Sequence, residues 1–116
     1  MACFVLMGLT AVQAQLPKTV SVGLINMSER NVIVQGYTVV NNVKRLGQPL
    51  QINKKASEKY EANVPAGVRF YTVYDANQPA RILLKDFPVP IQNRDVMLKL
   101  VPSPTNPKTL VLVPAD

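Results

Sequence analysis

Seven acidic side chains are the residues of this chain best suited to acid–base chemistry. They are Glu29, Glu58, Glu61, Asp75, Asp86, Asp95 and Asp116. Two carboxylates on either side of a glycosidic bond can hydrolyse it without any histidine. Most of these acids, however, adjoin a basic residue or a turn, and Glu58 and Glu61 are three residues apart, which places them on opposite faces of a strand. We therefore interpret them as solvated charges and turn residues.

Other catalytic and metal-binding patterns are missing from the sequence. The chain contains no histidine, which excludes a Ser-His-Asp triad, a Cys-His pair and the common zinc and copper ligands. Its five glycines never fall into a phosphate-binding pattern. The segment 75–77 supplies too few oxygen ligands for a calcium loop. We expect a protein that is not an enzyme, with no cofactor and no metal site.

The charge balance favours anionic partners. The chain carries 13 Lys and Arg residues against 7 Asp and Glu residues, a net charge of +6. Such a balance attracts an anionic polymer, an anionic surface or an acidic partner protein. The alternative is that the net charge only keeps the protein soluble. The densest basic stretch consists of Lys44, Arg45, Lys54, Lys55 and Lys59. This pattern is typical of a solvated face or a protected sheet edge.

Two neighbouring segments rich in aromatic, basic and aliphatic residues predict a β-hairpin. A turn centred on Asn77 would direct Phe70, Thr72 and Tyr74 toward the core. The opposite face then forms a candidate binding surface, which consists of Arg69, Tyr71, Arg81, Leu83 and Lys85. In this register Arg69 lies opposite Lys85, a costly pair of like charges that an anion would relieve, and Tyr and Arg are typical interface anchors. The alternative is a shifted register, or a second sheet that covers Tyr71 and Leu83.

Dense turn signals between short segments predict strands throughout the remaining chain. The expected strands are Thr19–Asn26, Asn31–Val40, Val43–Ile52, Ser57–Val64, Val68–Tyr74, Ala80–Asp86, Asp95–Val101 and Thr109–Val113. Gly47-Gln48-Pro49 divides the third of these into two short pieces, and Pro88 and Pro90 predict an irregular segment. We expect no helix. Turns about every 8–12 residues are typical of an antiparallel β-sandwich of about seven strands, either immunoglobulin-like or transthyretin-like. A small β-barrel is the alternative.

The first residues predict export. Residues 1–14 carry no charge, and Val12 and Ala14 stand at the positions that a signal peptidase reads before cleavage at Gln15. The apolar run is too short to span a membrane, which takes about 20 residues. We expect cleavage to leave residues 15–116 as one β-sandwich domain in the periplasm, on the cell surface or in the medium, without a transmembrane span.

Three hypotheses of function follow from these patterns. The first is an exported, non-enzymatic binding or accessory module that recognises an anionic ligand or a partner protein through the hairpin face. The second is a structural or assembly subunit that forms an oligomer by pairing Leu110–Val113 or Val20–Ile25 with another chain. The third is a cytosolic nucleic-acid-binding barrel with Tyr37, Tyr71 and Tyr74 as stacking groups. We favour the first and expect no specific nucleic-acid partner.

Overall fold

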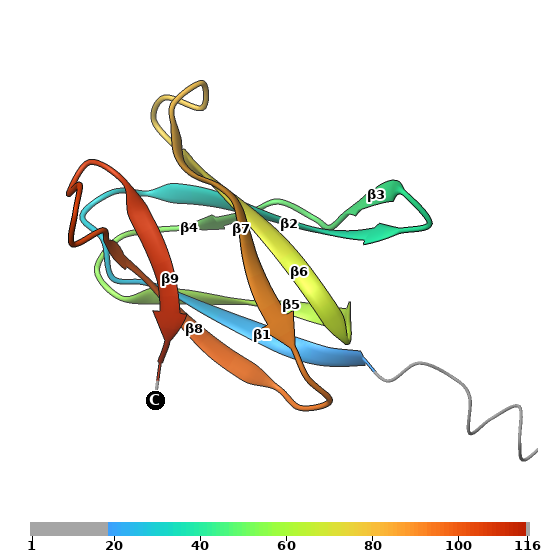
Figure 1. Ribbon diagram of the computed structural model, residues 1–116. Coiled ribbons are helices and arrows are strands. Elements are labelled where there is room, and N and C mark those ends of the chain that lie inside the picture. The colour runs from blue at the N-terminus through green and yellow to red at the C-terminus, as the bar shows by residue number, and fades with distance from the viewer. Residues whose placement is uncertain (1–18, 116) are drawn as a thin grey trace, which may run out of the picture.

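The computed structural model describes residues 19–115, which form an all-β sandwich (Figure 1). The strands are β1 (Thr19–Asn26), β2 (Val32–Val40), β3 (Val43–Leu46), β4 (Leu50–Ile52), β5 (Ser57–Pro65), β6 (Gly67–Asp75), β7 (Ile82–Ile91), β8 (Val96–Pro102) and β9 (Leu110–Pro114). No helix occurs in this part of the chain, so it contains none long enough to cross a membrane. The predicted sandwich is confirmed. The predicted signal segment, residues 1–14, lies outside the described residues.

The strands form two sheets. In the first sheet the order is β5-β1-β8-β9, and in the second it is β3-β2-β6-β7 with β4 also paired to β2. Most neighbouring strands are antiparallel, as predicted, but β1 and β8 run parallel. The position of β1 between β5 and β8 also shows that Val20–Ile25 is not a sheet edge, so this part of the second hypothesis is wrong. The other candidate strand, β9, does lie at an edge.

Alternating apolar residues fill the space between the sheets. In β1 the inward positions are Val20, Val22 and Leu24, and in β2 they are Val32 and Val34, all of which are buried. Full burial of one such side chain stabilises the fold by about 1.5–3 kcal/mol. The resulting core continues to β6, β7, β8 and β9.

Asparagine shapes the turn between β2 and β3. Asn41 and Asn42 have φ values of 51° and 64°, in the left-handed region that asparagine tolerates better than most residues. Left-handed conformations at both positions of a two-residue loop give the turn whose twist matches a β-hairpin. The β2–β3 hairpin therefore has a tight tip, and it extends beyond the body of the sandwich (Figure 1).

The strand β7 departs from the prediction. It runs from Ile82 to Ile91 and contains both Pro88 and Pro90, where an irregular segment was expected. The physical reason is its place in the sheet: β7 pairs with β6 alone, and an edge strand accommodates proline where the missing N–H would face away from the ladder.

A polar network holds the loops at one end of the sandwich. The buried amide of Asn26 donates to the carbonyls of Arg30 (2.7 Å) and Ile52 (3.0 Å). Nearby, the Asp75 carboxylate accepts hydrogen bonds from the backbone N–H of Asn77 and from Arg30, each at 2.9 Å. The Asn77 N–H, and after it the Arg30 guanidinium, hold the pKa of Asp75 below its usual range, although partial desolvation acts in the opposite direction.

Candidate functional site: a groove beneath the hairpin

The five residues predicted as a binding surface do not share an exposed face. Tyr71 and Leu83 are 0% and 1% exposed and Arg69 is 6% exposed, whereas Arg81 is half-buried and Lys85 is exposed. The predicted register is wrong: Arg69 pairs with Val89 rather than with Lys85. The pair nearest the turn is Tyr74–Ile82, which centres the turn on Gln78 instead of Asn77, and two irregularities then displace the ladder further. The face that carries Tyr71 therefore packs against the first sheet.

The residues expected in the core lie instead on the outer face of the second sheet. There Phe70 stacks on Tyr37, with 5.1 Å between ring centroids, and the Lys44 ammonium lies 4.5 Å from the centroid of Tyr37. The Tyr37 hydroxyl donates to Asp86 at 2.9 Å. Desolvation, and then this carboxylate, raise the pKa of Tyr37. Because these groups already satisfy one another, the cluster is a self-contained packing unit.

A buried polar cluster connects the two sheets. We call it the buried clamp; it consists of Thr38, Glu61, Arg69 and Tyr71. Arg69 forms a bidentate ion pair with Glu61, and its Nη1 donates to the Thr38 hydroxyl at 2.7 Å. The Tyr71 hydroxyl donates to Glu61 at 2.9 Å. The clamp therefore ties β5 in the first sheet to β2 and β6 in the second.

Two glycines provide the room for the buried clamp. A Cβ atom on Gly47 would lie 2.5 Å from both Arg69 Nη2 and Glu61 Oε2, and one on Gly36 would lie 2.7 Å from the Tyr71 ring. The backbone of these glycines is joined by a 2.8 Å hydrogen bond from the Gly47 N–H to the Gly36 carbonyl. Burial, and then the negative charge of Glu61, strongly raise the pKa of Tyr71. The phenol therefore remains protonated and keeps its hydrogen bond.

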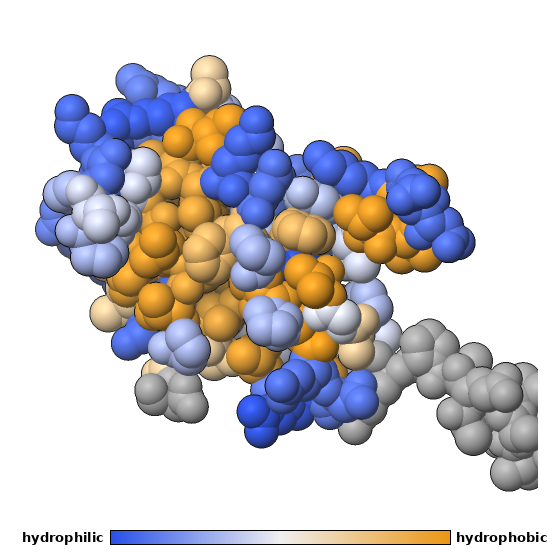
Figure 2. Space-filling view, viewed as in Figure 1, coloured by the Kyte–Doolittle hydropathy of each residue, from blue (hydrophilic) through white to orange (hydrophobic). Residues whose placement is uncertain are grey.

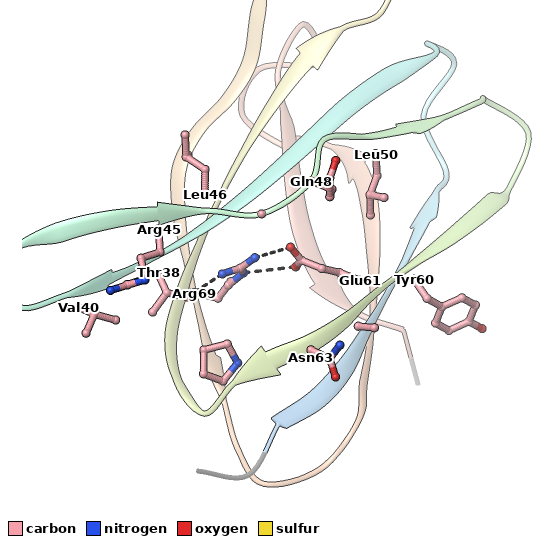
Figure 3. A pocket seen from close by; sticks show the side chains of 13 residues that line it. Thr38, Val40, Arg45, Leu46, Gln48, Leu50, Tyr60, Glu61, Asn63 and Arg69 are labelled. Carbon is pink, nitrogen blue, oxygen red and sulfur yellow. Dashed lines mark hydrogen bonds and ion pairs between the residues drawn. The ribbon is translucent and has the colours of Figure 1, made fainter. Parts of the chain in front are cut away.

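The buried clamp forms the floor of an open groove between the β2–β3 hairpin and β5. Figure 3 shows Glu61 and Arg69 pointing toward each other between these strands, with Tyr60 pointing away. The groove has a volume of about 550 Å³. Its further lining residues include Thr38, Val40, Arg45, Gln48, Leu50, Ala62, Asn63 and Pro65. We call this space the overhang groove.

Apolar side chains of the hairpin remain exposed above the overhang groove. Val40 lies on the same face of β2 as the core residues Val32 and Val34, and Val43 pairs with Val40 across the hairpin. Val40 is nevertheless 40% exposed and Val43 is 56% exposed. The hairpin thus carries the core-facing side of the second sheet past the end of the first sheet, and Figure 2 shows hydrophobic and hydrophilic side chains side by side on it.

The charges around the groove are unbalanced. In residues 19–115 the structure has two ion pairs, Arg30–Asp75 and Arg69–Glu61. Two exposed cations on the groove side take part in neither; they are Arg45 of the hairpin and Lys59 of β5. Arg45 lines the groove itself. The groove therefore combines an apolar wall with a cationic rim, and its one acid is already paired.

This arrangement provides contacts for binding but no group poised for acid–base catalysis. Glu61 is held by Arg69 and Tyr71, and within the described residues no three Cys, Asp or Glu side chains form a metal site. The sequence alone does not predict the groove, because Val40 and Val43 look like ordinary strand residues. The one available signal was Asn41-Asn42 between two β-branched segments, which indicates a hairpin but not whether a sheet covers it.

Comparisons with known proteins add no functional assignment. No protein-family model matches the chain, and no curated protein matches it. The function must therefore be inferred from the groove, the strands around it and their charges.

Proposed function

We propose that the protein is an exported, non-enzymatic binding module that holds an extended, acidic segment of a partner protein in the overhang groove. The observation that carries this proposal is the exposure of Val40 and Val43 on the core-facing side of the second sheet. Exposed apolar side chains beside an open groove are a usual mark of a protein interaction site.

The strands beside the groove favour an extended partner. β3 and β5 are edge strands of opposite sheets, so each has one side without a ladder partner in the described chain. A peptide in β conformation can use such an edge for main-chain hydrogen bonds and place alternate side chains in pockets. Val40 and Leu50 line the groove, and Val43, the ladder partner of Val40, continues the same apolar face at the hairpin tip.

The unpaired cations favour an acidic segment. Arg45 lines the groove and has no ion pair within residues 19–115, and Lys59 adds a positive charge on β5. A complementary charge increases both the association rate and the specificity of a partner. An anionic polysaccharide or lipid surface would use the charges but not the apolar wall, and we therefore favour a protein segment.

Export is a separate part of the proposal. It is supported by the uncharged residues 1–14 and the small residues before Gln15. Intact-mass measurement of the chain from its native source tests it, and we expect a chain that begins at Gln15. A chain that retains residues 1–14 in the cytosol would contradict export. Binding in the overhang groove is tested separately, by the peptide selection described next.

Selection from a phage-displayed library of random twelve-residue peptides tests the binding function. We expect the full chain to enrich peptides in which acidic and large apolar residues alternate. The Val43→Ser and Arg45→Glu variants should each weaken the selected peptides at least about tenfold, because one removes an apolar contact and the other reverses the charge. Val68→Ser is the matched control, since Val68 is 49% exposed on β6 but faces away from the groove.

Two results would overturn the proposed site. One is a set of peptides that bind the Val43→Ser and Arg45→Glu variants as tightly as the wild type. The other is a set of enriched peptides that share only their negative charge, whose binding is lost at high salt and is unaffected by Val43→Ser. That result would indicate a polyanion-binding surface instead.

A further inference from the structure

The outer face of the first sheet is unusually apolar. In β8 and β9 the inward residues Leu98, Leu100, Leu110 and Leu112 are buried, as expected for core positions. The alternate, outward positions are also mostly apolar: Met97, Val101, Val111 and Val113. Strands that are apolar on both faces are typical of a sheet covered on both sides.

This face extends across β1 to β5. Tyr60 and Met97 are the ladder partners of Gly23 on either side, and both side chains lie over it: a Cβ on Gly23 would clash with the Met97 sulfur and lie 2.9 Å from the Tyr60 ring. Tyr60 is nevertheless 55% exposed. The next outward residue of β1, Ile25, is half-buried. Apolar outward residues therefore occur on all four strands of the first sheet.

Two opposite charges interrupt this surface symmetrically. Glu58 and Lys99 are the ladder partners of Ile25 on its two sides, so they lie at the same level of the sheet with β1 between them. Neither forms an ion pair within residues 19–115. A positive and a negative charge at equal distances on either side of one strand form a self-complementary pattern.

We infer that the outer face of the first sheet binds the same face of a second copy of this chain, with a two-fold axis parallel to β1. Rotation about such an axis places Glu58 of each copy opposite Lys99 of the other. The same rotation places Tyr60 opposite Met97, and aromatic rings pack favourably against thioether sulfur. Closed two-fold dimers with one self-complementary patch are the commonest homo-oligomers, and sheets pack face to face with nearly aligned strands.

Sedimentation of charge-swapped full-length chains tests this dimer. We expect the wild type to change from monomer to dimer with increasing concentration. Glu58→Lys and Lys99→Glu should each weaken the dimer at least about tenfold, since each change places two like-charged pairs at the interface. An equimolar mixture of the two variants should dimerise again, because every cross-copy pair is then opposite in sign.

The controls separate this face from the overhang groove. Lys54→Glu makes the same charge change in the turn between β4 and β5 and should leave the dimer unchanged, as should Val43→Ser. Met97→Lys places a charge within the apolar part and should give a monomer with the circular dichroism spectrum of the wild type. A wild type that stays monomeric at millimolar concentration would overturn the inference. So would single swaps that dimerise normally, or a mixture that remains monomeric.

Discussion

The residues with the least room for substitution lie where the two sheets meet beside the groove. Arg69, Glu61 and Tyr71 are almost fully buried, and each polar atom among them has a partner. Gly36 and Gly47 are needed there for space rather than for an unusual backbone conformation, because only a residue without a side chain allows the backbone to approach the ion pair. A sequence shows such glycines but not what lies beneath them.

The Gly47→Ala variant tests this close approach. The added methyl group would lie 2.5 Å from Arg69 Nη2 and Glu61 Oε2, so the ion pair must shift. We expect the free energy of unfolding, measured by urea denaturation, to fall by about 1–3 kcal/mol. Gln48→Ala, a change at the exposed neighbouring residue, should alter it by less than about 0.5 kcal/mol. Equal stability of Gly47→Ala and the wild type would contradict the packing described above.

The lowered pKa of Asp75 predicts a contribution to stability that depends on pH. The pKa of Asp75 is lowered in the folded chain, so its contribution to stability is complete above the pKa of about 3.9 found in unfolded chains and is lost as the pH falls through the folded value. We expect Asp75→Asn to be less stable than the wild type at pH 7 and the difference to shrink below about pH 4. Urea midpoints at pH 7, 4 and 3 measure this.

A constant difference between wild type and Asp75→Asn over that pH range would contradict the assignment. Glu29→Gln provides the control because Glu29 is exposed in the neighbouring loop and forms no ion pair within residues 19–115. It should change stability at pH 7 by less than about 0.5 kcal/mol.

At the scale of elements, the buried clamp is what holds the edge strand β5 against the second sheet beside the groove. A buried ion pair contributes little net stability over an apolar replacement, but removal of one partner leaves an uncompensated buried charge. The pair therefore acts mainly by fixing how β5 lies relative to β2 and β6.

A double-mutant cycle tests this role. We expect Arg69→Met and Glu61→Gln each to lower the free energy of unfolding by about 3 kcal/mol or more. The double variant should lose less than the sum, because no buried charge remains and the amide introduced in place of the Glu61 carboxylate still accepts a hydrogen bond from Tyr71. Lys59→Met, at an exposed position of β5, is the control. Additive losses would show that the two side chains do not interact.

The elements themselves could be predicted in large part from the sequence. Alternation from Val20 to Leu24 predicted β1 with the bounds observed, and Gly47-Gln48-Pro49 correctly divided β3 from β4. The register between β6 and β7 could not be predicted, because the turn is centred one residue after Asn77 and two irregularities shift the ladder further. That error assigned Tyr71 and Leu83 to the surface although both are core residues.

In the whole molecule, each of the two sheets leaves one apolar surface uncovered. The β2–β3 hairpin continues past the first sheet and leaves Val40 and Val43 uncovered, whereas the first sheet carries an apolar outer face. Neither surface can be predicted from one segment of the sequence, because exposure depends on which strands of the other sheet pack against that segment. The two surfaces meet at Tyr60, which borders the groove and also belongs to the outer face of the first sheet.

Hydrogen–deuterium exchange with and without a saturating, library-selected acidic peptide tests whether the overhang groove binds an extended segment. We predict slower exchange of backbone amides in residues 38–46 and 57–65, because a strand in the overhang groove would bond to the free edges beside it. Exchange of the backbone amides in β7, β8 and β9 should stay unchanged. Protection confined to these strands, or no protection while the peptide is bound, would contradict the groove as the binding site.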